Sequence, residues 1–319
     1  MPHDGRPCII AASQRIEDQY IDAVKAVDPR VRIVRVSNND EWAQEVPNAE
    51  ILLGLRPRRD EISRAAQLRW VHTMGAGVDR LVRDFADSEI VVTNSHVHAE
   101  AISEHVFALL LAHTRQMREI FDYQAKREWG KRQIGGDNIS GRTMGILGLG
   151  NIGQAVAARA HAFGMKVRGV RRRARPTPEV DRVVGKDALD EVLRVADVLV
   201  VALPLTPETN HLLDGEKLAL LPKGAFVINI GRGALIDEPA LIRALTEGRL
   251  SGAGLDVFSE EPLPRVSPLW TTPNVIVSPH VSGNFPHYME RVIAIFIANL
   301  HKYLTGQPLS SVVDTTLGY

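Results

Sequence analysis

A glycine-rich turn between an apolar strand and a helix constrains this sequence more than any other feature. Residues 145–153 read Gly-Ile-Leu-Gly-Leu-Gly-Asn-Ile-Gly, and helical spacing follows over 154–163. Gly148 permits the tight turn, Gly150 lets a pyrophosphate approach the backbone, and Gly153 packs the helix against the strand. The turn therefore predicts a dinucleotide-binding α/β domain, with the pyrophosphate held where the helix begins. The predicted contacts are Gly148, Gly150, Asn151, Ile152 and Gly153.

Arginines follow the second strand of this domain, where the adenosine ribose is expected. Residues 171–175 read Arg-Arg-Arg-Ala-Arg, and no acid occurs before Glu179. A carboxylate here would bind the ribose 2′-OH, whereas a guanidinium binds a phosphate through two hydrogen bonds. We therefore expect NADP(H) to be preferred through Arg171 and Arg172, with NAD(H) as the second cofactor. The alternative is a basic loop that is only solvated.

Short apolar strands alternate with amphipathic helices along the whole chain, which predicts parallel sheets with helical crossovers. Strands are expected at 8–12, 31–36, 51–54, 70–73, 90–93, 143–149, 167–170, 198–203, 225–230, 252–257 and 275–278. Helices are expected at 16–27, 99–124, 154–163 and 288–304, with a looser glycine-bearing stretch at 127–142. This rhythm predicts two α/β units in succession.

Composition argues against several other classes of protein. Lys and Arg number 38 and Asp and Glu number 38, so a net charge of zero argues against nucleic-acid and anionic-membrane partners. Cys8 is the single cysteine, so neither an internal disulfide nor a redox pair is expected. No apolar run reaches the ~20 residues of a membrane span, and the N-terminus lacks a signal-peptide pattern. We expect a soluble protein of a reducing compartment, the cytoplasm.

Three later strands each lead to one ionisable residue: Arg232, Glu261 and His280. Gly231 and Gly233 flank the arginine and are expected to give its backbone unusual freedom. Ligands of an open parallel sheet gather beyond the carboxyl ends of its strands. The three side chains are therefore expected to converge beside the nicotinamide.

The order and spacing of these motifs resemble those of the D-isomer-specific 2-hydroxyacid dehydrogenases. Beside the glycine-rich turn, the matching runs are Pro204-Leu205-Thr206-Pro207-Glu208-Thr209, Asn229-Ile230-Gly231-Arg232-Gly233, Gly254-Leu255-Asp256-Val257-Phe258, Glu261-Pro262 and Pro279-His280. They extend over residues 90–290, and the Gly75-Ala76-Gly77-Val78-Asp79 loop makes the N-terminal third compatible.

The resemblance implies a mechanism that agrees with the chemistry of the three ionisable residues. Arg232 would bind the substrate carboxylate and polarise the carbonyl, a planar task that suits a guanidinium. His280 would give a proton to the carbonyl oxygen as hydride arrives at carbon, and take it in reverse. Glu261 would orient the imidazole and favour its protonated form.

The resemblance also implies further contacts with substrate and cofactor. Backbone N–H groups of Ala76 and Gly77 would hold the second carboxylate oxygen. Arg56 is a further substrate candidate, and the alternative for it is a surface arginine. Asp256 would contact the nicotinamide carboxamide. The other implied cofactor contacts are Pro204, Thr209, Ile230, Gly231, Ser282 and Gly283.

The fold expected from the resemblance has two doubly wound parallel-sheet domains. A Rossmann-type cofactor domain would span 96–285, and a flavodoxin-like substrate domain would combine 1–95 with 286–319. The implied reaction is reduction of a small 2-keto acid, such as glyoxylate or hydroxypyruvate, to the D-2-hydroxy acid by NADPH. A homodimer is expected, with contacts in 99–142, where Trp129 would pack across the interface.

Two alternatives remain open at this point. The fold also occurs in dinucleotide-sensing corepressors that bind partners without catalysis, although only catalysis requires Arg232, Glu261 and His280 together. His96 and His98, with His72, have the residue type of metal ligands, but no third ligand follows at metal spacing. We therefore expect no metal.

Overall fold

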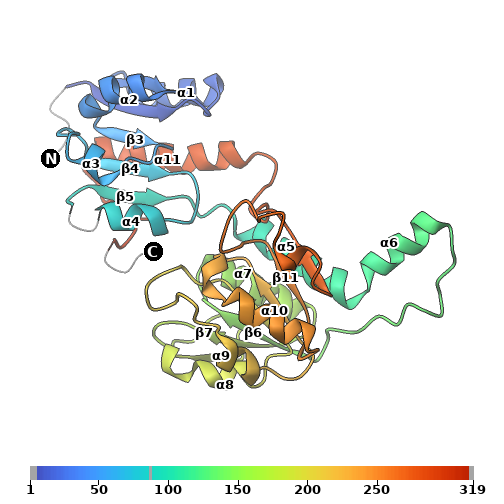
Figure 1. Ribbon diagram of the computed structural model, residues 1–319. Coiled ribbons are helices and arrows are strands. Elements are labelled where there is room, and N and C mark those ends of the chain that lie inside the picture. Colours follow the sequence, from blue (N-terminus) through green and yellow to red (C-terminus); the bar gives the residue numbers. More distant parts are fainter. Residues whose placement is uncertain (1–5, 86–87, 316–319) are drawn as a thin grey trace. The chain divides into compact units, whose positions relative to one another are not determined.

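The computed structural model describes residues 6–85 and 88–315, and the chain divides into two compact units. Unit 1 takes the described residues up to Val97 together with those from Phe285 onward, and unit 2 takes His98–Asn284. Unit 1 has a five-stranded sheet and unit 2 a seven-stranded sheet (Figure 1). All the strand pairs of both sheets are parallel, so the prediction of two parallel α/β domains is confirmed.

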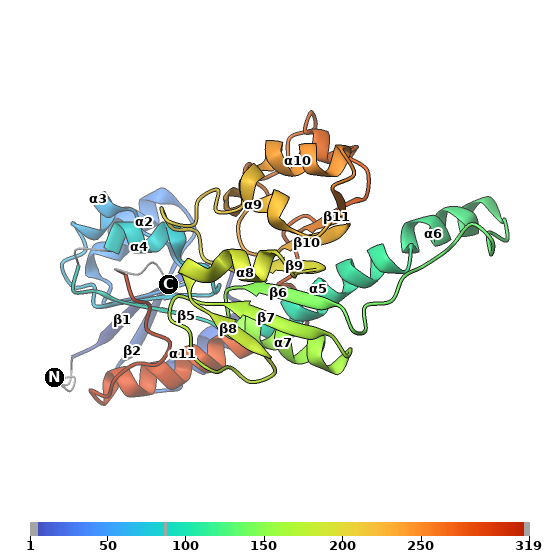
Figure 2. The same cartoon turned by 90° about the horizontal axis from the view of Figure 1, so that it is seen from below.

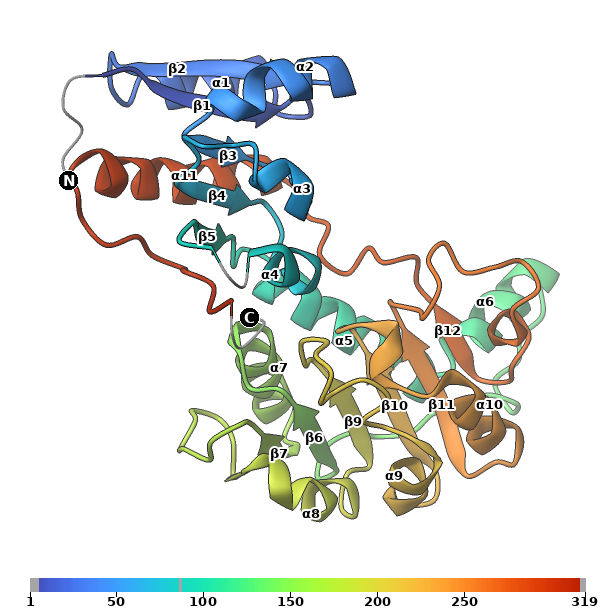
Figure 3. The ribbon, with the colours of Figure 1, turned by 60° about the vertical axis from the view of Figure 1, so that its left-hand side comes forward.

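The sheet of unit 1 has the strand order β2-β1-β3-β4-β5, which is the flavodoxin-like order. Its strands are β1 (Cys8–Ser13), β2 (Val31–Val36), β3 (Ile51–Leu53), β4 (Trp70–Thr73) and β5 (Val91–Asn94). Its helices are α1 (Asp18–Lys25), α2 (Asn39–Glu45), α3 (Arg59–Ile62), α4 (Asp79–Phe85) and α11 (Tyr288–Leu304). Helix α11 comes from the end of the chain, yet it lies along the sheet of unit 1 (Figure 3). Its Phe296 stacks on Trp70 of β4 with ring centroids 4.9 Å apart. Residues more than two hundred positions apart therefore share one core.

The sheet of unit 2 has the strand order β12-β11-β10-β9-β6-β7-β8. Counted from β6, this is the dinucleotide-binding order 3-2-1-4-5-6 with β12 added beside β11. Its strands are β6 (Thr143–Leu147), β7 (Lys166–Val170), β8 (Arg182–Val184), β9 (Val198–Val201), β10 (Ala225–Asn229), β11 (Leu250–Leu255) and β12 (Val275–Val277). Its helices are α5 (Ala99–Thr114), α6 (Met117–Lys126), α7 (Asn151–Ala162), α8 (Leu189–Leu193), α9 (Gly215–Leu220) and α10 (Glu238–Thr246). The carboxyl ends of β10, β11 and β12 consequently lie at one edge of the sheet.

The prediction of one helix over 99–124 is wrong, because two helices occupy this region. Gln116 separates them with a φ of 52°, a left-handed conformation that a right-handed helix cannot include. Helix α6 and the segment after it project from the rest of unit 2 as an arm (Figure 2). The Oε1 atom of Gln116 accepts the N–H groups of Gly135 (2.8 Å) and Gly136 (3.2 Å), which ties the returning chain to the base of the arm.

Candidate active site

The turn between β6 and α7 needs its glycines for different structural reasons. Gly148 has a φ of 98°, and a Cβ there would lie 2.6 Å from the carbonyl oxygen of Ala202. A Cβ at Gly153 would lie 1.9 Å from the Gly148 oxygen, so only glycine lets α7 approach the strand this closely. Beside Gly150, by contrast, an added Cβ would meet no atom within 4 Å. The turn thus combines close packing on one side with open space on the other.

The start of α7 faces this open space with backbone donors. The N–H of Gln154 bonds to the Gly150 oxygen (2.9 Å), the first hydrogen bond of the helix. The N–H groups of Asn151, Ile152 and Gly153 precede it and have no partner inside the helix. Such donors, reinforced by the helix dipole, bind phosphate groups. The turn therefore fits the pyrophosphate of a dinucleotide.

The arginine-rich loop follows β7 directly. Arg171 is half-buried, and its Nη1 donates to Oγ1 of Thr177 (3.3 Å), which closes the loop on itself. Arg172 and Arg173 are exposed to solvent. The loop therefore presents guanidinium groups at the carboxyl end of β7, the end at which the ribose of a dinucleotide lies in this fold.

A threonine organises the loop after β9, where Pro204 and Thr209 are predicted cofactor contacts. Oγ1 of Thr209 donates to the carbonyl oxygen of Pro204 (2.8 Å) and accepts the N–H of Thr206 (2.8 Å). These bonds fold the proline-rich motif into a compact turn. Both predicted residues therefore have a structural role, and their contact with a cofactor stays a prediction.

Arg232 follows β10 and is held by the last residue of that strand. The buried Asn229 accepts the N–H of Gly231 (3.1 Å) and donates to the carbonyl oxygen of Arg232 (2.9 Å). The arginine backbone is extended, with φ −142° and ψ 146°. A Cβ at Gly233 would lie 1.9 Å from the carbonyl carbon of Phe258. The prediction that the glycines give Arg232 backbone freedom is wrong, because Gly233 instead permits a close approach of the chain after β11.

The structure brings two of the three predicted catalytic residues into contact. Nδ1 of His280 lies 2.7 Å from Oε2 of Glu261. The other oxygen of this carboxylate, Oε1, accepts the N–H of Phe258 (3.0 Å). The imidazole is therefore oriented through Nδ1, while Nε2 is left to exchange a proton with a ligand.

Asp256 organises the loop that carries His280. The side chain of Asp256 is fully buried, and its carboxylate accepts Oγ–H of Ser278 (2.6 Å) and the N–H groups of Val281 (3.0 Å) and Ser282 (3.1 Å). These three donors lie on both sides of His280, whose φ of 55° is in the left-handed region. Sequence reasoning missed this role, although a carboxylate at the end of a buried strand signals a need for hydrogen-bond donors. The predicted contact of Asp256 with a nicotinamide stays a prediction.

In unit 1, two side chains shape the loop that contains Ala76 and Gly77. The hydroxyl of Tyr288 donates to the carbonyl oxygen of Met74 (2.8 Å), and Nδ2 of Asn94 donates to that of Ala76 (2.8 Å). Within the described part of the chain, the N–H groups of residues 75–77 have no acceptor. Hydrogen bonds thus fix the carbonyl groups of the loop, while its N–H groups stay available. Such N–H groups can bind an anion such as a carboxylate.

Tyr288 and Asn94 were not identified as loop supports from the sequence. Tyr288 is the first residue of α11, so a distant segment supplies its hydroxyl, and only the polar end of strand β5 points to Asn94. Burial raises the pKa of Tyr288, and the charge of Arg56 acts in the opposite direction. Arg56, exposed beyond β3, is therefore within electrostatic range of the residue that supports the loop.

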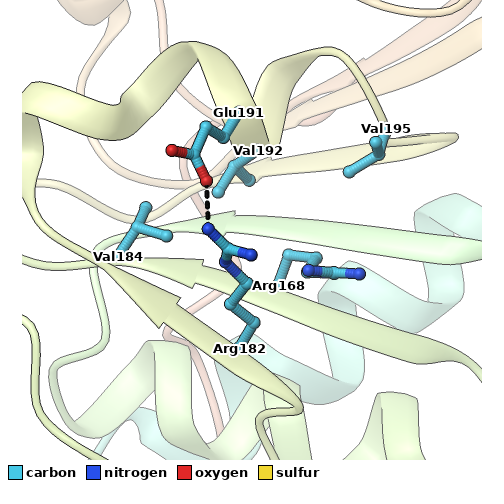
Figure 4. A pocket seen from close by; sticks show the side chains of 6 residues that line it. All are labelled: Arg168, Arg182, Val184, Glu191, Val192 and Val195. Atoms are coloured by element: carbon cyan, nitrogen blue, oxygen red, sulfur yellow. Dashed lines mark hydrogen bonds and ion pairs between the residues drawn. The ribbon is translucent and has the colours of Figure 1, made fainter.

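Two hollows on the surface of unit 2 do not involve the predicted site residues. The first, of about 190 Å³, lies between β7, β8 and α8, where Arg182 pairs with Glu191 (Figure 4). Its lining residues are Arg168, Arg182, Val184, Glu191, Val192 and Val195. The second, of about 330 Å³, lies beside the segment that follows the arginine loop, and its lining includes Arg175 and Asp181. Neither hollow coincides with the strand ends that carry Arg232 and His280.

The described residues contain neither a cluster of metal-ligating side chains nor a helix that could span a membrane. In residues 6–85 and 88–315, no group of three or more His, Cys, Asp or Glu side chains is arranged to hold a metal ion. His72 instead lies inside β4, bonded through Nδ1 to Thr93 (2.8 Å) and through Nε2 to Ser95 (3.1 Å). No helix in these described ranges has the length and apolar character needed to cross a membrane.

Comparison with known proteins identifies relatives along most of the chain. Residues 107–282 match the sequence profile described as D-isomer specific 2-hydroxyacid dehydrogenase, NAD binding domain. A D-3-phosphoglycerate dehydrogenase of Methanocaldococcus jannaschii is 33% identical over 307 residues, which cover 92% of this chain but only 57% of that relative. Glyoxylate/hydroxypyruvate reductase B of Serratia proteamaculans is 35% identical over 289 residues, covering 88% of this chain and 89% of the relative.

A solved structure has the same fold over nearly the whole chain. It is a D-isomer specific 2-hydroxyacid dehydrogenase from Xanthobacter autotrophicus Py2 in complex with NADPH and MES. The two chains superpose with a TM-score of 0.86 and are 31% identical, and the match covers 98% of this chain and 100% of that one.

Proposed function

Because the chain belongs to the D-isomer-specific 2-hydroxyacid dehydrogenases, a family of NAD(P)-dependent oxidoreductases, we propose that it reduces a small 2-keto acid with NADPH. The product would be the D-2-hydroxy acid, and glyoxylate and hydroxypyruvate represent the substrate class. The contact between Glu261 and His280 at 2.7 Å carries this proposal, because it prepares an imidazole for proton transfer. The names of the Serratia reductase and of the NADPH-bound Xanthobacter enzyme support the substrate class and the cofactor.

For the cofactor, we propose that unit 2 is the binding domain. Gly150 and the N–H groups at the start of α7 would hold the pyrophosphate, where the structure leaves open space. Arg171 and Arg172 would bind the 2′-phosphate, since the loop after β7 offers guanidinium groups and no carboxylate before Glu179. NADPH held by these residues would supply the hydride that the carbonyl carbon of the substrate accepts.

For the substrate, we propose two sets of carboxylate ligands. Arg232 would bind the carboxylate and polarise the neighbouring carbonyl, while Asn229 fixes the backbone that carries it. In unit 1, the N–H groups of residues 75–77 would hold a carboxylate oxygen, and Arg56 would add positive charge near their loop. The free N–H groups in that loop support its assignment to substrate rather than to structure.

His280 would complete the reduction. Its Nδ1 faces Glu261, so its Nε2–H is the group that gives a proton to the carbonyl oxygen. That oxygen becomes the hydroxyl of the product, and the neutral imidazole regains its proton from solvent. In the reverse direction the same Nε2 atom takes the hydroxyl proton.

We further propose that the arm is the contact of a homodimer. Its α6 has no buried residue, and Trp129 and Phe121 are 93% and 59% exposed. Exposed aromatic side chains on a projecting segment are costly unless a partner covers them. A second copy of the chain would supply that cover. Light scattering should report a dimer for the native chain and a shift to monomer for Trp129→Glu.

The catalytic proposal is tested by a panel of 2-keto acids with NADPH and with NADH. We expect oxidation of NADPH by glyoxylate or hydroxypyruvate, and loss of turnover in His280→Gln with cofactor affinity kept. If no member of the panel oxidises either cofactor, the reductase proposal is wrong. A chain that binds the cofactor without turnover would instead favour the corepressor type of protein.

A further inference from the structure

The loop that carries His280 depends on one buried carboxylate. Asp256 is 0% exposed and accepts hydrogen bonds from Ser278, Val281 and Ser282, which surround the histidine. A buried carboxylate is costly unless donors or a cation compensate its charge. The conformation of the loop therefore depends on the groups that compensate the charge of Asp256.

An imidazole approaches this carboxylate from another element. Nε2 of His105 lies 3.7 Å from Oδ1 of Asp256, which is within ion-pair distance. Among the described residues, no arginine or lysine forms an ion pair with Asp256. Nε2 of His105 is itself buried and has no hydrogen-bond partner in the described part of the chain. Nε2 of His105 thus lacks a hydrogen-bond acceptor, and the carboxylate of Asp256 has no arginine or lysine to balance its charge among the described residues.

The packing of α5 against β11 fixes this approach. Three successive pairs face each other: His113 with Gly252, Leu109 with Gly254, and His105 with Asp256. A Cβ at Gly252 would lie 3.0 Å from His113, and one at Gly254 would lie 3.0 Å from Leu109, so both glycines let the helix approach the strand closely. Four residues of helix rise about 6 Å and two residues of strand about 6.6 Å, so helix and strand stay in register. The position of His105 beside the carboxylate thus follows from the alignment of two elements.

We propose that His105 is a positioning residue of this enzyme, whose Nε2–H supports the buried carboxylate of Asp256 and thereby fixes the loop that carries His280. The inference rests on the proposed function, because it assigns His105 to the reductase reaction. Among the described residues, His105 forms no hydrogen bond or ion pair with Glu261, with His280 or with the glycine-rich turn. It acts through Asp256, which holds the donors on both sides of His280 at its left-handed φ of 55°.

A double-mutant cycle tests the proposal. The chains are the native protein, His105→Leu, Asp256→Asn and the double variant, each measured for kcat, for KM of the keto acid and for the midpoint of urea unfolding. We expect His105→Leu to lower kcat about tenfold in the native background and less than about twofold beside Asp256→Asn. The KM of the keto acid should change little, because Arg232 and the loop of unit 1 are untouched.

A conservative variant and a matched control sharpen the cycle. His105→Gln keeps an N–H donor and should retain kcat within about threefold, unlike His105→Leu. His113→Leu removes another α5 histidine, which bonds Ser251 (3.1 Å) and forms no hydrogen bond or ion pair with Asp256 in the described part of the chain. Its effect on the unfolding midpoint should be the same in both backgrounds.

The outcomes separate this inference from the proposed function. Equal losses of kcat from His105→Leu in both backgrounds, or equal losses from His105→Leu and His105→Gln, would overturn the positioning role. If Asp256→Asn does not fold, the comparison of His105→Leu with His105→Gln still tests the positioning role. If the native chain has no turnover, the proposed function is wrong, and the shifts of the unfolding midpoint still decide whether His105 and Asp256 are coupled.

Discussion

The carboxylate of Glu261 contacts the imidazole of His280 at 2.7 Å while its second oxygen accepts the N–H of Phe258 at 3.0 Å. The backbone therefore restricts rotation of the carboxylate, and the carboxylate restricts rotation of the imidazole. An oriented imidazole at the end of a strand is what a proton transfer to a fixed carbonyl requires.

The charge of Glu261 should matter more than its hydrogen bond. Glu261→Gln can still reach His280 but no longer stabilises an imidazolium, so kcat should fall about tenfold or more. The alkaline limb of the kcat profile for keto-acid reduction, where His280 no longer carries the proton that it donates, should move to lower pH. Steady-state kinetics across pH 5–9 checks this, and Glu260→Gln, at the exposed neighbouring position, is the matched control. An unchanged profile in Glu261→Gln would contradict the assignment.

The preference for NADPH should depend on Arg172. Arg172→Ser removes a guanidinium from the loop, so the ratio of kcat/KM for NADPH over NADH should fall about 10–100-fold. Arg173→Ser changes the next exposed arginine, which is not a predicted contact, and should leave the ratio within about twofold. A native enzyme that prefers NADH would refute the cofactor prediction outright.

The hydroxyl of Tyr288 should influence substrate binding. Tyr288→Phe frees the carbonyl of Met74, so the N–H groups of residues 75–77 are held less firmly and the KM of the keto acid should rise about fivefold. The KM of NADPH should stay constant. Tyr303→Phe is the control, because that hydroxyl, also on α11, donates to Glu50 at 2.5 Å. Equal effects of both variants on KM would mean that the tyrosines act only through stability.

The free energy of unfolding should decrease as the pH falls below about 6.5, because the buried His72 resists protonation in the folded chain. Burial lowers the pKa of His72 to about 4, below the value of about 6.5 that it has in an unfolded chain. The unfolded chain therefore binds a proton first as the pH falls, so folding loses about 3 kcal/mol of free energy between pH 6.5 and pH 4. Above pH 6.5 this contribution is constant. Urea unfolding of the native chain and of His72→Gln should differ in slope against pH only within that window.

The alternation of strands and helices was sufficient to predict the fold class, because buried parallel strands appear as continuous apolar runs. Strand β8 was missed because Arg182–Val184 is only three residues long and begins with a charged residue. The break at Gln116 was missed because helical spacing continues through it, and the backbone reversal depends on bonds to Gly135 and Gly136. The local spacing of apolar residues cannot predict hydrogen bonds between such distant residues.

The candidate site was predictable where each functional residue directly follows a strand that the sequence itself reveals. Glu261 and His280 were identified from strand ends that the sheet brings to one edge. The supports were not, because Asn94 and Tyr288 reach their loop from β5 and α11, far apart in the sequence. The same holds for His105, whose relation to Asp256 exists only once α5 lies along β11.

The return of α11 to the first sheet also bears on the order of synthesis. Trp70 leaves the ribosome long before Phe296, the ring on which it stacks, whereas unit 2 is contiguous from His98 to Asn284. Domains tend to fold as units while the chain is still being made. Unit 2 can therefore be complete while the strands of unit 1 still expose the apolar face that α11 covers. Until α11 has been synthesised as far as Leu304, the nascent first domain should bind chaperones. Unit 2, in the middle of the chain, should therefore fold before unit 1.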